Sequence, residues 1–174
     1  RLTRAEALHL ARAGALEAFQ SGRRKAAWEA LRAAGDLLPL APARVLPFDP
    51  RELNNEEMVF LDYIATGIST NGHPMQFMRE RLSAAGVASA RDMETSYIDG
   101  DRIVIAGLVV ARQHPQTAKG TVFLLLEDEF GYMNIIFPRH LYEKYGETVK
   151  FWTFMVNEGK FEREGNVMNV IGRR

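Results

Sequence analysis

One stretch of the chain, residues 112–134, carries side chains that could bind a single-stranded nucleic acid. Cations in a polar loop can neutralise phosphates, and aromatic rings on the following strands can stack on bases, at about 1–3 kcal/mol each. An amide side chain near its end offers a donor and an acceptor to a base edge. The residues concerned are Arg112, His114, Lys119, Phe123, Tyr132 and Asn134.

The composition requires that any such surface be a local patch. The 174 residues include 22 Lys and Arg and 22 Asp and Glu, so no net charge attracts nucleic acid or anionic membrane. The absence of cysteine excludes disulfides and thiolate metal sites. No apolar run approaches the roughly 20 residues needed to span a bilayer. We therefore expect a cytoplasmic protein with no membrane partner.

Residues 1–35 predict the helical end of a larger helical region. Thr3 and Glu6 have the spacing of a capping box, which satisfies free amides at a helix start. A second predicted helix opens with a basic triplet, which opposes the helix dipole. These side chains therefore serve something other than helix stability, and either a phosphate backbone or a solvated turn fits them. The triplet is Arg23, Arg24 and Lys25.

Two further segments precede the strand-rich half of the chain. Residues 36–53 form a proline-rich linker, which the prolines stiffen. Residues 54–98 predict a helical pair followed by a polar connection. Asn54 caps the first helix with Glu57 three residues on, and Pro74 takes the favoured first-turn position of the second.

Residues 99–174 predict a five-stranded barrel. Strands are expected at 102–112, 121–127, 132–137, 150–160 and 167–171, with a short helix at 138–145. This is the order of an oligonucleotide/oligosaccharide-binding (OB) fold, whose ligand face uses strands two and three and the loops one–two and four–five. Those loops are Gln113–Gly120 and Lys160–Asn166, and the latter adds Lys160 and Arg163 as phosphate contacts. The predicted fold class is α+β, with N-terminal helical segments followed by an OB-fold β-barrel.

The alternation of side chains along strands sorts the central hairpin into two faces. It places Phe123 and Tyr132 on the outer face with Asn134, while their neighbours point into the barrel. An alternative is that both rings cover the sheet beneath the helical segments. OB barrels also serve as protein-binding modules, so the fold alone does not decide the ligand.

Acidic residues form two clusters that could suggest a divalent-metal site, Asp99 with Asp101 and the run Glu127–Glu129. Both lie at predicted turns, where aspartates initiate turn hydrogen bonds and charges stay solvated. We therefore predict no metal site. The chain also has no phosphate-cradling glycine loop, G-x-S-x-G elbow or H-E-x-x-H motif, so we predict no catalytic residue.

The run GLVVARQHPQTAKGTVFLLLEDEFG, from Gly107 to Gly131, closely resembles the C-terminal part of bacterial C-family (DNA polymerase III alpha-like) DNA polymerases. Within that family it is most similar to the error-prone, damage-tolerant branch. Three other stretches occur in family order. LARAGAL at 10–16 resembles the end of the helix-hairpin-helix region, RRKAAW at 23–28 the following helix, and TGISTNGHP at 66–74 the turn before the barrel.

The resemblance implies a non-catalytic tail of a template-directed, translesion DNA polymerase, a nucleotidyltransferase of DNA replication and repair. The family's two catalytic metals are held by palm-domain aspartates, so the resemblance implies no cofactor within this chain. Its barrel would engage single-stranded template DNA. Alternatively, the barrel docks other polymerase or damage-response proteins, or the chain is the same region of a replicative alpha subunit.

Two details refine this expectation. A chain that starts at Arg1 and stops at Arg174, just after the fifth strand, suggests a fragment, nearer to the error-prone branch. The hairpin also resembles the anticodon-binding barrel of aspartyl-type tRNA synthetases. That resemblance implies that Phe123 stacks on a base and that Asn134 reads one.

Overall fold

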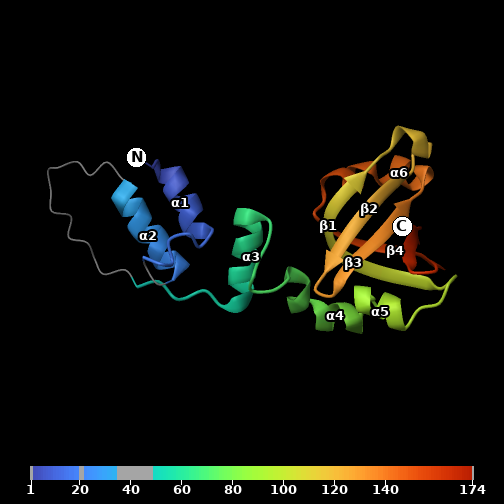
Figure 1. The fold of residues 1–174 in the computed structure, drawn as a ribbon, viewed down its shortest axis with the longest axis horizontal. Helices are drawn as coiled ribbons and strands as arrows, with labels where there is room; N and C mark the ends of the chain where they lie inside the picture. Colours follow the sequence, from blue (N-terminus) through green and yellow to red (C-terminus); the bar gives the residue numbers. More distant parts are fainter. Residues whose placement is uncertain (1, 20–21, 35–48, 174) are drawn as a thin grey trace. The chain divides into compact units, whose positions relative to one another are not determined.

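The computed structural model describes residues 2–19, 22–34 and 49–173, in two compact units, Arg1–Gly72 and His73–Arg174 (Figure 1). The first unit contains α1 (Arg4–Arg12), α2 (Arg23–Ala34) and α3 (Asn55–Thr66). The second contains η1 (Pro74–Phe77), α4 (Arg79–Ala84), α5 (Ala90–Thr95), β1 (Arg102–Gln113), η2 (Gln116–Ala118), β2 (Val122–Asp128), β3 (Gly131–Phe137), α6 (Arg139–Phe151), β4 (Phe154–Glu164) and β5 (Val167–Gly172). Most of the proposed linker, residues 36–48, lies outside the described residues.

The predicted helix starts of the first unit are confirmed. At α1 the Thr3 amide donates to Glu6 Oε2 at 2.8 Å, and the Glu6 amide donates back to Thr3 Oγ1 at 3.3 Å. Asn54 and Glu57 exchange the same pair of bonds at α3, at 3.0 and 2.8 Å. Each box satisfies two amides that a helix start leaves without an intrahelical acceptor.

The strands of the second unit form the predicted OB barrel. They close in the order β1-β2-β3-β5-β4, with α6 between β3 and β4 in sequence. The β3–β5 pair is parallel and the other pairs are antiparallel. This closure leaves both sheet edges paired, and the alternating side chains fill the interior.

The barrel core is closed at its two ends by helices (Figure 1). Interior residues such as Ile105, Leu126 and Phe161 are fully buried. Leu141 and Val149 of α6 join this core at the end where β2 begins, and Ala90 and Met93 of α5 join it at the β2–β3 turn. The hairpin is therefore held at both ends, which positions its outer face. The buried residues of the core are Ala88, Ala90, Met93, Ile103, Ile105, Val109, Val122, Leu124, Leu126, Met133, Ile135, Phe137, Leu141, Val149, Met155, Phe161 and Val170.

Several boundaries differ from the prediction. The helix after β3 extends to Phe151 rather than 145, because the chain remains helical past a distorted Tyr145 (φ −117°) and buries Val149. As a result β4 begins at Phe154 and runs to Glu164. The connection at 87–100 contains α5, whose missed sequence signal is a capping box formed by Ser89 and Asp92. The boundary between the two units falls at Gly72, between α3 and η1.

Gly159 of β4 provides a test of this packing. A Cβ at Gly159 would lie 2.4 Å from the Ile171 carbonyl oxygen of β5, so Gly159→Ala must push β4 and β5 apart. We expect a loss of about 1–3 kcal/mol in the free energy of unfolding, measured by urea denaturation. Gly146→Ala in α6 is the matched control, because its Cβ would meet only the Tyr142 ring, at 3.9 Å. That change should be neutral or gain up to about 1 kcal/mol, and equal effects at the two positions would contradict the register.

Candidate nucleic-acid interface

The outer face of the β2–β3 hairpin carries the predicted stacking residues. Phe123 and Tyr132 are 37% and 64% exposed, and Asn134 is also exposed. The residues between them on each strand, such as Leu124 and Met133, are buried. The predicted alternation is thus confirmed, and neither ring is buried in the barrel unit.

The register shows how these residues are spaced. Phe123 pairs with Ile136, Leu125 with Asn134, and Glu127 with Tyr132. The two rings therefore lie four positions apart along the strands, about 13 Å, with Asn134 in the row between them. Asn134 Nδ2 donates to the Met168 carbonyl at 3.4 Å, a long bond that orients the amide.

The rows of paired residues also continue from β3 onto β5 and β4. Asn134 pairs with Asn169, so two amide side chains lie side by side on the outer face. Sequence reasoning missed Asn169, because only the parallel β3–β5 pairing brings it next to Asn134. In the next row, Ile136 of β3 pairs with Phe123 of β2 on one side and with Ile171 of β5 on the other. Ile171 in turn pairs with Lys160 of β4, so Lys160 lies in the same row as Phe123.

The β1–β2 loop lies at one end of this face and carries His114 and Lys119, both exposed. Lys119 adopts a left-handed conformation with φ 51°, and the following Gly120 has φ 88°. The His114 ring lies 4.9 Å from the Tyr142 ring of α6. The loop is thus packed against α6 and presents its cation at the start of β2.

Arg112 serves mainly to attach this loop to α6. Its Nε donates to the Val149 carbonyl at 2.7 Å, and its Nη2 donates to the Trp152 carbonyl. A guanidinium at the C-terminal end of a helix satisfies carbonyls that lack intrahelical donors. The sequence-based role of Arg112, a phosphate contact, therefore competes with an intramolecular role.

The two cations predicted for the β4–β5 loop lie on strand β4 instead. Lys160 Nζ is 3.2 Å from Glu162 Oε1, in an exposed pair. Arg163 donates to the Met93 and Glu94 carbonyls at 2.8 and 2.9 Å, at the C-terminal end of α5. Lys160 therefore stays available on the outer face, whereas Arg163 attaches α5 to the barrel.

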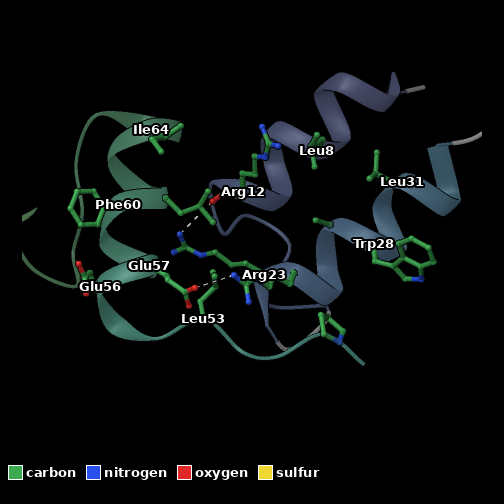
Figure 2. Close-up of a pocket in the computed structure, with 14 residues that line it drawn as sticks. Leu8, Arg12, Arg23, Trp28, Leu31, Leu53, Glu56, Glu57, Phe60 and Ile64 are labelled. Atoms are coloured by element: carbon green, nitrogen blue, oxygen red, sulfur yellow. Dashed lines mark hydrogen bonds and ion pairs between the residues drawn. The ribbon is translucent and has the colours of Figure 1, made fainter. Parts of the chain in front are cut away.

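Arg23 and Arg24 of the basic triplet border a hollow of about 650 Å³ between α1, α2 and α3 (Figure 2). Arg23 is buried, forms an ion pair with Asp62 of α3, and bonds Glu17 Oε1 at 2.9 Å. Arg24 lies 3.2 Å from Glu57, whose pKa is lowered to about 2, chiefly by a hydrogen bond from Arg51. The apolar residues of the lining are Leu8, Ala27, Trp28, Leu31, Pro50, Leu53, Phe60, Leu61 and Ile64.

These contacts give a structural role to Arg23, one of the three cations at the start of α2. Arg23 joins α2 to α3 through its buried ion pair with Asp62, which offsets its unfavourable place in the helix dipole. Lys25 is half-buried in the same turn. The phosphate role predicted for the triplet stays a prediction, and Arg23 already has a structural one.

The acidic turn Glu127–Glu129 corrects the expectation that its charges stay solvated, because the Asp128 side chain is fully buried and that of Glu129 is 10% exposed. Asp128 has no exposed side-chain surface and accepts from the Ala90, Phe130 and Gly131 amides at 2.8, 2.8 and 3.1 Å. Arg79 of α4 bonds Asp128 at 3.0 Å and Glu129 at 2.6 Å. Burial alone would raise the pKa of Glu129, but the Arg79 bond lowers it overall. The cluster ties the hairpin turn to α4 and α5.

In the other acidic pair, Asp101 makes the predicted turn bond, whereas Asp99 bonds strand β4. Asp99 accepts from the Arg163 amide and Asp101 from the Ile98 amide, both at 3.0 Å. Within the described part of the chain, no three His, Cys, Asp or Glu side chains converge as a metal site would require.

No helix among residues 2–19, 22–34 and 49–173 is long and apolar enough to cross a bilayer.

The strand order, the closed barrel and the exposed aromatic and amide face define the second unit as an OB-fold module. The chain is 37% identical over 177 residues to the error-prone DNA polymerase of Anaeromyxobacter dehalogenans (strain 2CP-C), covering 98% of this chain and 15% of that protein. It is 36% identical over 165 residues to the error-prone DNA polymerase of Corynebacterium efficiens, covering 93% and 15%. The chain is therefore similar over almost its whole length to error-prone DNA polymerases, as its motifs predicted, and spans about 15% of the length of these relatives.

Similarities to solved structures are weaker. The asparaginyl-tRNA synthetase of Pyrococcus horikoshii matches with a TM-score of 0.38 and 17% identity, covering 44% of this chain and 19% of that one. The p204 HINb domain matches with a TM-score of 0.37 and 11% identity, covering 53% and 46%. No family model matches the chain. The assignment of the OB fold therefore depends on the strand order and closure of the barrel itself.

Asp128 offers a direct test of how the hairpin is held. Asp128→Ala leaves Arg79 and three amides without their shared acceptor, so we expect a loss of about 3–5 kcal/mol in barrel stability. Urea denaturation in a Trp28→Phe background would follow the barrel through Trp152. Glu143→Ala, which removes one partner of an exposed pair on α6, should cost less than about 1 kcal/mol. A loss below about 1 kcal/mol at Asp128 would contradict its proposed role.

Proposed function

We propose that this chain is a non-catalytic part of a template-directed, error-prone DNA polymerase, and that its OB barrel binds single-stranded template DNA. Nucleotidyl transfer, and the divalent metals it needs, belong in this proposal to parts of the polymerase outside these residues. Translesion synthesis is the activity that the whole polymerase would perform.

The observation that carries the proposal is the exposed face of the β2–β3 hairpin. Phe123 offers a ring face for stacking, Asn134 and the neighbouring Asn169 offer amide groups to base edges, and Lys119 and Lys160 offer cations. These groups lie on one continuous outer surface of a closed barrel. Homology to error-prone DNA polymerases makes DNA the natural ligand for it.

A second candidate function, protein docking, is favoured by a different surface of the barrel. Trp152, Phe154 and Val156 are 63%, 37% and 62% exposed at alternate positions leading into and along β4. Val110 of β1 is 46% exposed, and the bond from the Val109 amide to the Thr153 carbonyl places it beside them. An apolar stripe of this kind commonly marks a protein contact. The partner would be another polymerase or damage-response protein with an apolar surface.

Replacing Phe123 tests the DNA proposal. Phe123→Ala removes one stacking platform, so affinity for a fluorescein-labelled oligothymidylate should fall by about 1–3 kcal/mol in fluorescence anisotropy titrations. Binding of the unchanged chain should also weaken with salt, as phosphate contacts require. Phe154→Ala is the matched control, because Phe154 has the same 37% exposure on a different face. Equal affinity for all three proteins, or no salt dependence, would refute DNA binding by this face.

The docking candidate predicts the reverse pattern. A chain with Trp152→Ser and Phe154→Ser should keep its affinity for single-stranded DNA. It should no longer bind a partner protein that the unchanged chain captures. That partner would be identified by mass spectrometry, and its binding would be repeated with purified protein. The Phe123→Ala chain should still capture it. A purified partner that binds all these proteins equally would exclude the stripe as its docking site.

A further inference from the structure

The charges of the barrel unit are divided between its two ends, although the chain as a whole is neutral. Residues 112–121 and 138–152, which form the β1–β2 loop and α6, contain five lysines and arginines and two acidic residues. Residues 79–101 and the turn 127–129, at the other end of the hairpin, contain eight acidic residues and three arginines. A phosphate chain is therefore attracted to the α6 end and repelled from the turn end.

The β1–β2 loop and α6 lie side by side at this end of the barrel (Figure 1). Arg112 bonds two carbonyls at the end of α6, and His114 packs 4.9 Å from Tyr142. At the other end of the loop, a Cβ on Gly120 would lie 2.9 Å from the Arg139 side chain, which shows how closely Arg139 approaches it. The cations of α6 are thus fixed relative to the loop that leads into Phe123.

Two α6 cations lie on the side that contacts the loop. Arg139 lies against Gly120, its side chain is 70% exposed, and the side chain of its ion-pair partner Glu143 is 60% exposed. Lys150 lies with Nζ 5.7 Å from the Tyr142 ring, the same ring that meets His114. Lys144 differs, because its Nζ lies 4.9 Å from the Tyr145 ring instead.

We infer that Arg139 and Lys150 bind phosphates of the same single strand, so that the interface continues from Phe123 across the β1–β2 loop onto α6. This inference rests on the proposed DNA binding of the hairpin face. The strand leaves the sheet at its basic end and does not cross the acidic turn. An OB barrel with no net charge can then hold an anionic strand, because its favourable field is concentrated along this path.

The test uses the whole 174-residue chain and oligothymidylates of roughly 6 and roughly 16 nucleotides, which bracket common OB-fold site sizes. Arg139→Gln and Lys150→Gln should each weaken binding of the longer strand about threefold to tenfold at low salt. Each should also lower the salt slope by about 0.7. The short strand, which the sheet face alone can hold, should lose little. Lys144→Gln on the same helix and Arg81→Gln at the acidic end are matched controls.

The outcomes separate the two claims. If Phe123→Ala weakens binding while Arg139→Gln and Lys150→Gln match their controls in affinity and salt slope, the α6 path is wrong and the hairpin proposal stands. If the unchanged chain binds neither oligonucleotide at low salt, both claims fail. Circular dichroism melts of each variant would establish that a loss of binding is not a loss of folding.

Discussion

The buried carboxylate of Asp128 holds the barrel's hairpin in place. It accepts three backbone amides, from α5 and from its own turn, and its charge is balanced by Arg79 of α4. A buried charge is stable only when it is paired and hydrogen-bonded in this way. Because the turn end is fixed by Asp128 and the opposite end is closed by α6, the strands between them present a defined outer face. The spacing of Phe123, Asn134 and Tyr132 on that face depends on this attachment.

Several charged side chains that resemble ligand-binding groups are used within the protein. Arg23 joins α2 to α3, Arg112 joins the β1–β2 loop to α6, and Arg163 joins α5 to β4. Arginine suits this task because its planar fork can bond several carbonyls or carboxylates at once. Lys119, Arg139, Lys144 and Lys150 remain exposed near the start of β2 and on α6. A neutral chain can therefore offer a local basic surface without an overall positive charge.

Much of the fold follows from local sequence patterns, whereas parts of the site depend on tertiary contacts. The capping boxes at Thr3 and Asn54, the alternation around Phe123, and the strand–helix order were readable because each signal lies within a few residues. The length of α6 was underestimated because its last turns are stabilised by burial of Val149 in the barrel. The partners of Arg23 and Asp128 could not be predicted, since Asp62 and Ala90 lie 39 and 38 residues away in sequence. Asn169 was missed for the same reason.

The central claim is that a single strand of DNA crosses the outer face of β2 and β3 and leaves it at the α6 end. An amide-resolved nuclear magnetic resonance titration of the ¹⁵N-labelled chain with oligothymidylate tests it most directly. A strand on this path should shift the amide signals of residues 113–125, 134–136 and 139–150 and leave the acidic turn at 127–131 unaffected. Shifts grouped instead at that turn, or along Trp152, Phe154 and Val156, would contradict it.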